Sequence, residues 1–274
     1  MSGLTVGIPC YYKDNPNYLD LAIHSVINQT LPPYEIHLIQ DGELNNALNR
    51  IIKHYSENKK IRILRLETNS GLAKALNKSI MTCNTKYYAR MDADDISAPD
   101  RFEKQLKFLE INKHIDILGT WAYDIDNYGK ITGTRKTPVT QEAIIKYIWS
   151  NPFVHPSVMF NKDSLIRKVG LYNEKLIKRQ DYELWFRCAN AGLKMANIPE
   201  PLIYYRFSEE WFQKNNASVI WEQVKIGWQG CRKIHASYYA YIAVTVPLLK
   251  VLFPGKIGIR LTKLLRFFDP RYKG

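Results

Sequence analysis

The chain is poor in cysteine. Its 274 residues include 4 cysteines, Cys10, Cys83, Cys188 and Cys231, and no two of them form a C-x-x-C pair. Closely spaced pairs are typical of disulfide frameworks and of structural zinc sites. The cysteine pattern therefore argues against both and favours reduced thiols in a cytosolic protein.

Long hydrophobic runs are also absent. The first apolar stretch, Leu4–Ile8, is too short for the hydrophobic region of a secretory signal peptide, so we expect none at this end. A later apolar segment, Tyr238–Phe253, contains Pro247 and Lys250 and is shorter than the ~20 residues that a spanning helix needs. The sequence shows no internal repeat and no low-complexity segment.

Acidic residues are outnumbered by basic ones. With 39 Lys and Arg against 26 Asp and Glu, the formal net charge is +13. Such an excess indicates a polyanionic partner, which can be a nucleic acid, an anionic membrane surface or a phosphorylated substrate. The 46% of hydrophobic residues is enough for a real core, and the length predicts one large domain or one domain with an appendage.

The first half of the chain alternates between strand-like and helix-like segments. Apolar residues at helical spacing predict helices at Tyr18–Gln29, Asn45–Tyr55 and Leu72–Met81. Short apolar runs predict strands at Leu4–Ile8, Glu35–Ile39, Ile61–Leu66 and Tyr87–Met91. This order predicts an α/β fold, a mostly parallel central sheet flanked by helices on both faces.

The second half is less regular. We expect helices at Arg101–Asn112, Gln141–Trp149 and Asp181–Ala191, and strands at Ile115–Tyr123, His155–Phe160 and Ile198–Arg206. Between them, Gly129–Gly133 predicts a turn or hairpin.

Three carboxylates follow the predicted strand Tyr87–Met91. Asp92, Asp94 and Asp95 would repel one another unless a cation joins them. A hard divalent cation prefers oxygen ligands and shares them with substrate phosphates, and ligands of open α/β sheets bind at the carboxyl ends of strands. The alternative is an Asp-rich turn that caps the helix beginning near Pro99.

The last fifty residues differ in character. Basic residues flank or follow the apolar segment, and Ile257–Phe268 is itself basic and amphipathic. Apolar anchors beside a Lys/Arg face suit a helix that lies in a membrane interface. The alternative is a helical hairpin that packs on the main domain with solvated charges.

A set of motifs resembles glycosyltransferase family 2, the inverting nucleotide-sugar transferases of the GT-A fold. They are Val6–Tyr11, Ser25–Thr30, Gln40–Gly42, Asn69–Asn77, Met91–Asp95, His155–Ser157, Val169–Tyr172, Gln180–Trp185 and Tyr204–Arg206. The resemblance implies a GT-A domain over residues 1–210, with a nucleotide-binding half at about 1–100 and an acceptor-binding half at about 101–210. Residues 211–274 would form a helical, membrane-associating extension.

The resemblance implies roles for the acidic cluster. Asp92-Ala93-Asp94 looks like the D-x-D motif of the family. Asp92 would contact the ribose or the metal, and Asp94 would bind Mn²⁺ or Mg²⁺ directly. Asp95 would face the donor sugar, an acceptor or diphosphate group, or cap the next helix.

The resemblance also implies a nucleotide pocket. Asp41 matches the acid that contacts the nucleobase, although Gln40 stands where the family often has a second acid; the structural alternative is an Asx turn with Gly42. Pro9 and Tyr11 would form the wall of this pocket, and Lys74 would touch the nucleotide or remain solvated.

Asp181 matches the catalytic base of the family. Inversion needs one carboxylate, opposite the departing diphosphate, that takes the proton of the acceptor hydroxyl. The alternative is an N-cap aspartate, and here too a glutamine, Gln180, stands where the family often has an acid. His155, Arg179 and Arg206 are candidate contacts for the acceptor or a diphosphate, with a structural role as the alternative.

The function implied is that of a metal-dependent inverting hexosyltransferase. The closest resemblance is to bacterial enzymes of O-antigen and capsule synthesis. The protein would then move a sugar from a UDP-linked donor to a lipid-diphosphate-linked saccharide at the inner face of the cell membrane.

Two other classes of protein stay open: a sugar-phosphate nucleotidyltransferase, and a basic nucleic-acid-binding protein. The first would need a Gly-rich phosphate loop after the first strand, which Pro9–Asp14 is not. The second would need clustered arginines with exposed aromatics, so we expect no nucleic-acid partner.

Overall fold

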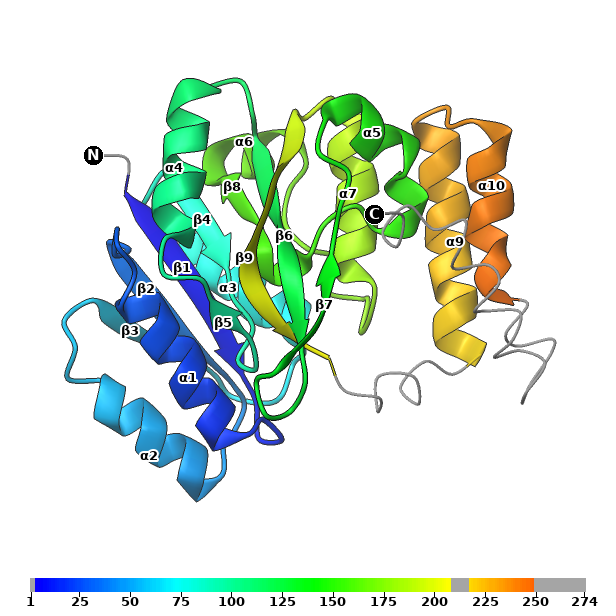
Figure 1. Cartoon of the computed structure of the whole chain (residues 1–274). Coiled ribbons are helices and arrows are strands. Elements are labelled where there is room, and N and C mark those ends of the chain that lie inside the picture. Colours follow the sequence, from blue (N-terminus) through cyan, green and yellow to red (C-terminus); the bar gives the residue numbers. More distant parts are fainter. Residues whose placement is uncertain (1–2, 208–216, 249–274) are drawn as a thin grey trace.

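The computed structural model describes residues 3–207 and 217–248. Within these ranges a nine-stranded sheet runs through the molecule in the order β3-β2-β1-β4-β8-β6-β9-β5, with β7 paired to β6 (Figure 1). The strands are β1 Leu4–Cys10, β2 Glu35–Asp41, β3 Ile61–Leu66, β4 Tyr87–Arg90, β5 Ile96–Ser97, β6 Ile117–Ile125, β7 Ile131–Arg135, β8 Met159–Asn161 and β9 Met195–Arg206. The helices are α1 Pro16–Ile27, α2 Asn46–Tyr55, α3 Leu72–Thr82, α4 Arg101–Ile111, α5 Gln141–Lys146, α6 Lys162–Lys168, α7 Gln180–Asn190, α9 Ala217–Lys233 and α10 Tyr238–Thr245.

The first half of the chain forms the parallel part of the sheet. β1 pairs in parallel with both β2 and β4, and β2 pairs in parallel with β3. Every residue of β1 is buried, because helices cover both faces of this strand. The predicted alternation of strands and helices is confirmed here, with ends that differ from the predicted ones by two residues at most.

The prediction of a mostly parallel sheet is wrong for the second half, where the sheet is mixed. β8 runs antiparallel to both β4 and β6, whereas β6 and β9 are parallel. The turn at Gly129 has φ +85 and leads β6 into β7 as the expected hairpin. A strand that enters between two others in the opposite direction leaves no mark in hydrophobic periodicity, which reports burial but not direction.

Two predicted elements are shorter than expected, and two short ones were not predicted. Pro156 has no N–H to donate to a ladder, and residues 155–157 form a 3₁₀ turn before the strand β8 begins at Met159. The helix predicted to reach Trp149 ends at Lys146 and is followed by a 3₁₀ turn at Ile148–Ser150. The sequence prediction omitted β5 and α6, which have only two and seven residues.

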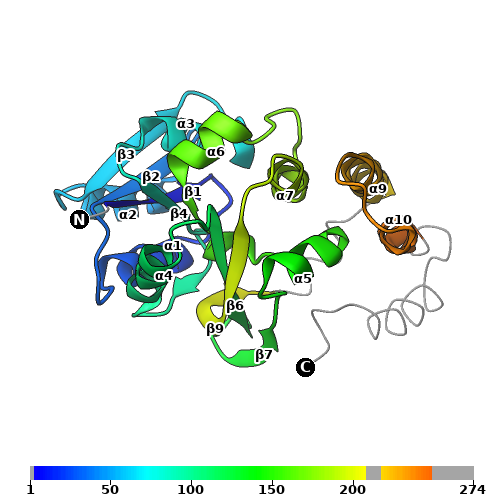
Figure 2. The ribbon, with the colours of Figure 1, turned by 90° about the horizontal axis from the view of Figure 1, so that it is seen from above.

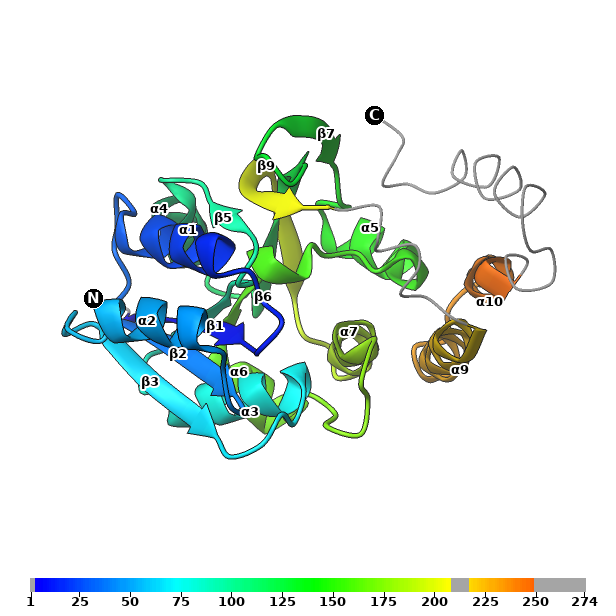
Figure 3. The same cartoon turned by 90° about the horizontal axis from the view of Figure 1, so that it is seen from below.

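The helices form a layer on each side of the sheet. Leu19 of α1, Leu48 of α2 and Phe102 of α4 belong to one core cluster, which lies on one face. Helices α3, α6 and α7 contribute to a second cluster on the other face, as the view from above shows (Figure 2). Neither layer covers the end of the sheet at which β1, β2 and β4 finish. The loops that follow these strands lie there (Figure 3).

Helices α9 and α10 lie side by side beyond α7, at the end of the molecule remote from β3 (Figures 1 and 2). Gly230 packs so closely on the ring of Phe186 that a Cβ at this position would overlap it. Cys231, Ala240 and Val244 belong to the same core cluster as α7. Residues 217–248 therefore form two helices that pack on the main domain, whereas the amphipathic stretch Ile257–Phe268, on which the membrane prediction depends, lies outside the described residues. Among the helices of the described ranges, none combines the length and the apolar character that crossing a bilayer requires.

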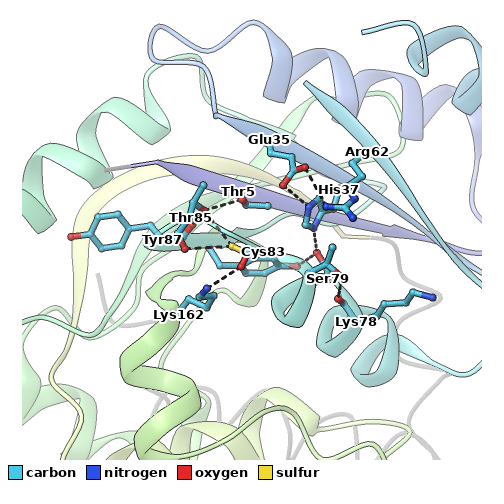
Figure 4. A network of polar contacts seen from close by, with 12 residues as sticks. Thr5, Glu35, His37, Arg62, Lys78, Ser79, Cys83, Thr85, Tyr87 and Lys162 are labelled. Atoms are coloured by element: carbon cyan, nitrogen blue, oxygen red, sulfur yellow. Dashed lines mark hydrogen bonds and ion pairs between the residues drawn. The ribbon is translucent and has the colours of Figure 1, made fainter. Parts of the chain in front are cut away.

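A buried polar network ties β2 to α3 and β4 (Figure 4). The ring of fully buried His37 lies between Glu35 and Ser79, with Nε2 2.9 Å from Glu35 Oε2 and Nδ1 2.9 Å from Ser79 Oγ. Tyr88 donates from its hydroxyl to the same Ser79 Oγ. Burial lowers the pKa of His37, and the hydrogen bond that His37 donates to Glu35 offsets this only in part. The cavity described below has none of these residues in its lining, so we assign the network to stability.

We expect His37→Gln to make folding less sensitive to acid. The pKa of His37 is lower in the folded than in the unfolded chain, so the unfolded chain binds a proton more readily as pH falls through ~6.5. The native protein should therefore lose stability between pH 7 and pH 5, and the variant should lose less. Urea midpoints at pH 7, 6 and 5 measure this, and an identical pH dependence in both proteins would contradict it.

Candidate active site

The carboxyl ends of β1, β2 and β4 border a cavity of about 480 Å³. Figure 3 looks at the molecule from this end of the strands. The lining residues come from the loop after β1, the end of β2, the start of α3 and the segment after β4. They are Pro9, Cys10, Tyr11, Tyr12, Asp14, Asp41, Asn69, Gly71, Leu72, Ala75, Arg90, Asp92, Ala93 and Asp94. Six of the residues named in advance from the sequence thus meet in one place: Pro9, Tyr11, Asp41, Asp92, Ala93 and Asp94.

The loop after β1 forms one wall of the cavity. Tyr11 is 37% exposed, so its ring is open to a ligand, and its backbone N–H donates to Asp14 Oδ2 over 2.9 Å. Burial raises the pKa of Asp14 to about 7, with the nearby Asp94 and Asp92 adding to the effect. Asp14 thus brings a further acidic group to the wall that faces the D-x-D segment.

Asp41 organises the opposite wall. Its two carboxylate oxygens accept hydrogen bonds from the backbone N–H groups of Ser70 (2.6 Å) and Gly71 (2.9 Å). Gly71 is the N-cap of α3 with φ +91, and no side chain caps this helix. The Asx turn with Gly42, considered from the sequence, is not the arrangement found. Asp41 instead holds the loop before α3, whose N-terminal end faces the cavity and favours an anion.

The acidic cluster lies at the end of β4. One carboxylate oxygen from each of Asp92, Asp94 and Asp95 lies within 4.8 Å of the other two. Burial in the cleft and the charge of Asp92 raise the pKa of Asp94 to about 6, and burial with its acidic neighbours raises the pKa of Asp95 well above its usual value. This set of hard oxygen atoms fits a divalent cation, which would relieve the repulsion.

None of these aspartates caps the next helix. The N-cap of α4 is Asp100, so the capping alternative is wrong. Asp95 Oδ1 accepts from the backbone N–H of Arg206 over 2.8 Å, while its buried Oδ2 has no hydrogen-bond partner among the described residues. That unpartnered oxygen is the part of Asp95 that remains for a cation.

Two buried arginines fix the backbone of this segment. Arg206 donates from Nε to the carbonyl of Asp94 and from Nη1 to the carbonyl of Asp126, over 2.9 and 2.7 Å, and lies 3.9 Å from the ring centre of Tyr18. Arg101 donates to the carbonyl of Arg90. The sequence suggested that Arg206 contacts a ligand. In the structure its guanidinium instead binds main-chain carbonyl groups and so holds the acidic loop in place.

Asp181 lies in the first turn of α7. The N-cap of α7 is Arg179, at φ +63, so the N-cap role considered for Asp181 is not found. The Asp181 Oδ2 atom accepts from the Asn151 amide over 2.9 Å. Burial alone would raise the pKa of Asp181, but His155, Asn151, the helix N–H of Tyr182 and Arg179 outweigh it and lower that pKa. Asp181 is thus an ionised carboxylate at neutral pH, near enough to Asp92 to raise the pKa of that group.

His155 interacts electrostatically with Arg90 and with Asp181. Its Nε2 lies 2.8 Å from the Tyr172 hydroxyl, and its ring packs at 5.9 Å on Trp185. Burial and the charge of Arg90 lower the pKa of His155 to about 3, so the imidazole is neutral at neutral pH. Lys74, by contrast, is exposed on α3 and does not line the cavity.

Several residues of the cavity and the site were given no role from the sequence, among them four polar or charged ones that bear on its chemistry. Asp14, Asn69 and Arg90 line the cavity, and Asn151 binds Asp181. Arg90 is the last residue of β4, two residues before Asp92, and Asp14 lies in the loop that follows β1, so their positions near strand ends were the available signal. Asn151 lies 30 residues from Asp181, and no local pattern connects the two.

The site thus combines an acid-lined cavity at the carboxyl ends of parallel strands with one further carboxylate on α7. The chain belongs to glycosyl transferase family 2, whose family model matches residues 5–170.

A curated relative agrees with this family, and solved structures share the fold. The chain is 32% identical over 254 residues to an Escherichia coli UDP-Gal:alpha-D-GlcNAc-diphosphoundecaprenol beta-1,3-galactosyltransferase, covering 90% of this chain and 92% of that one. The fold resembles S. aureus TarS 1–349 in complex with UDP-GlcNAc, with TM-score 0.68, 16% identity and coverage of 91% and 71%. It also resembles the mannosyltransferase PcManGT from Pyrobaculum calidifontis in complex with GDP-Man and Mn2+, with TM-score 0.63, 13% identity and coverage of 97% and 79%.

Proposed function

We propose that this protein is an inverting, metal-dependent hexosyltransferase that uses a UDP-sugar as donor. One observation carries the proposal: Asp41 and the D-x-D carboxylates line a single cavity, and Asp181 acts electrostatically on Asp92 from the neighbouring helix α7. A donor in the cavity would thus have its reacting carbon between a diphosphate site and a base.

Each wall of the cavity has a part in binding the donor. Pro9 and Tyr11 would flank the nucleobase, and Asp41, which already fixes the loop before α3, would accept from a base N–H. Asp92 and Asp94, with the free oxygen of Asp95, would hold Mn²⁺ or Mg²⁺. Bound there, the cation would act as a Lewis acid that neutralises charge on the departing diphosphate.

Asp181 would take the proton of the acceptor hydroxyl as that oxygen attacks. Its lowered pKa means that the carboxylate needs no prior deprotonation at neutral pH. Asn151 orients one oxygen of the carboxylate and leaves the other to face the acceptor. Attack by the acceptor oxygen and loss of the nucleoside diphosphate from the opposite face form and break one bond each, so the anomeric configuration inverts.

The donor and acceptor classes follow from the relatives. A UDP-sugar donor is supported by the printed activity of the E. coli relative and by the fold shared with TarS, which was solved with UDP-GlcNAc. We propose a lipid-diphosphate-linked saccharide as acceptor, because that relative acts on a diphosphoundecaprenol-linked sugar. The pathway would then be synthesis of a bacterial surface polysaccharide.

Incubation of the protein with a panel of UDP-sugars and Mn²⁺ tests this function. We expect slow UDP release with one sugar, faster release with a lipid-diphosphate-linked acceptor, and a product of inverted anomeric configuration by NMR. A nucleotidyltransferase would instead release pyrophosphate from UTP and a sugar phosphate. Salt-dependent binding of plain duplex DNA, without UDP release, would favour the third class.

We further propose a peripheral position at the inner face of the membrane, with residues 1–210 as the catalytic domain and 211–274 as the membrane-associating part. The outer face of α9 supports it. Trp221, Lys225, Trp228 and Arg232 recur at helical spacing and are all exposed. Trp221 and Trp228 are 51% and 49% exposed, although both are large apolar side chains. Alternating tryptophan and basic residues suit the headgroup region of an anionic bilayer.

We expect the double substitution Trp221→Ala and Trp228→Ala to weaken binding to phosphatidylglycerol vesicles about tenfold, because both side chains are interfacial anchors. Vesicle flotation measures it. The double substitution removes the ring contact of Trp228 with Tyr241 of α10. It leaves the buried residues of α9 in place, unlike a truncation, which would uncover α7. Tyr128→Ala is the matched control, since Tyr128 is 96% exposed in the turn between β6 and β7. Equal vesicle binding by the wild type and the double variant would contradict the placement.

A further inference from the structure

Arg90 is the one arginine beside the acidic cluster that the described part of the protein leaves largely unpaired. The side chain is 3% exposed. Its Nη2 contacts Asp92 Oδ1, but its Nε and Nη1 have no hydrogen-bond partner in residues 3–207 and 217–248. Buried donors of a charged group are costly when unpaired, so their presence here calls for a functional reason.

The two neighbouring arginines, unlike Arg90, have protein partners for their donors. Arg101, fully buried, donates from Nε to Gln105, from Nη1 to the sulfur of Met91 and from Nη2 to the carbonyl of Arg90. Arg206 donates to two carbonyls, as described above. Both are bound by protein groups and neither lines the cavity, whereas Arg90 does line it.

The surroundings of Arg90 show which part of a ligand it would meet. It extends from the end of β4, and the charged or polar groups that act on it are Asp92, Asp95 and Tyr172. In turn its charge acts on His155, which lies next to Asp181. Arg90 therefore lies between the candidate cation site and the candidate base, where a donor would have its diphosphate and its reacting carbon.

Competition between Arg90 and a bound cation for Asp92 also indicates a phosphate group as the ligand of Arg90. Among residues 3–207 and 217–248, Asp92 is the only carboxylate that forms an ion pair with Arg90, and it is also one of the three that can hold a cation. A cation that draws on Asp92 weakens the one ion pair of Arg90 and leaves the guanidinium in need of another anion. A phosphate presents oxygen atoms that match the guanidinium fork, because two parallel N–H donors can bind it at once.

We propose that Arg90 binds the diphosphate of the nucleotide donor and holds it as the leaving group. The assignment rests on the proposed function and deepens it. Arg90 would share the negative charge of the departing nucleoside diphosphate with the cation held by the aspartates. The nucleoside would make no contact with it, since Pro9, Tyr11 and Asp41 lie on the other walls of the cavity.

Equilibrium binding of UMP, UDP and inorganic pyrophosphate to the full chain tests the proposal, with Mn²⁺ and separately in EDTA. For Arg90→Gln we expect at least a tenfold rise in the Kd of UDP and of pyrophosphate, and less than a twofold change for UMP. The loss should also appear in EDTA, which separates it from a change in cation affinity through Asp92. Arg90→Lys should recover part of the affinity, because it restores the charge without the fork.

Arg135→Gln is the control, because Arg135 pairs with Asp124 at 2.9 Å and does not line the cavity. We expect it to leave the ratio of UMP to UDP affinity unchanged. A folded Arg90→Gln protein that keeps the wild-type ratio would overturn the proposal, and so would a loss seen only with an intact UDP-sugar, which would assign Arg90 to the sugar. If the wild type binds neither UDP nor pyrophosphate, the proposed function itself fails and Arg90 has no diphosphate to hold.

Discussion

Asp181→Asn should abolish sugar transfer while leaving nucleotide binding intact. The amide has the shape of the carboxylate and can keep a contact with Asn151, but it cannot accept the acceptor proton. Loss of a general base typically costs ~10²–10⁴-fold in rate. Asp181 does not line the nucleotide cavity, so the Kd of UDP with Mn²⁺ should change by less than about twofold, a free-energy change of well under 1 kcal/mol. Initial rates and calorimetry on the same preparation measure the two effects.

Glu183→Gln is the matched control for this substitution. Glu183 lies in the same first turn of α7 and pairs with Arg187 at 2.8 Å, on the side of the helix that faces the loop around Val169. Its replacement should leave the transfer rate within a few-fold of wild type. Full activity of Asp181→Asn, or an equal loss in both variants, would remove Asp181 from the role of base.

Asp94→Asn should remove the metal dependence of UDP binding. Asp94 lines the cavity and, although enclosed by the cleft, has the most exposed side chain of the acidic cluster. Exchange of a carboxylate for an amide removes a charge from the cation site and part of the repulsion that the cation relieves. We expect the affinity for UDP in Mn²⁺ to fall at least about tenfold, which corresponds to ~1.4 kcal/mol, and affinity in EDTA to stay the same. Titration of UDP with and without Mn²⁺ measures both.

Asp100→Asn provides the comparison for Asp94. Asp100 is also acidic and close in sequence, but its carboxylate pairs with Lys104 at 2.7 Å on the surface of α4. Replacement there should change neither affinity. If Asp94→Asn keeps the full enhancement by Mn²⁺, the cation binds elsewhere or the other aspartates suffice without Asp94.

The sequence was most informative where chemistry and local structure coincide. The ends of β1, β2 and β4 could be placed to within two residues from short apolar runs that stop at polar residues. Because parallel strands bring their carboxyl ends to one edge, the six predicted lining residues from these ends could be expected to meet. Strand direction in the second half could not, since β8 enters antiparallel between β4 and β6.

Contacts between distant side chains were beyond the reach of sequence patterns. The amide of Asn151 that orients Asp181, and the main-chain N–H groups of Ser70 and Gly71 that bind Asp41, follow from tertiary packing. Arg206 is a case in which the sequence suggested a role that the tertiary contacts do not support. Its charge and motif suggested a ligand contact, but the structure directs its donors to the carbonyls of Asp94 and Asp126.

A crystal grown with UDP and Mn²⁺, with anomalous data collected at the manganese edge, tests most directly whether the aspartates after β4 hold a cation on a bound diphosphate. We expect one anomalous peak within bonding distance of Asp94 and of Asp92 or Asp95, with the uracil beside Tyr11 and Asp41. A manganese peak remote from these carboxylates, or UDP bound outside the cavity, would contradict it.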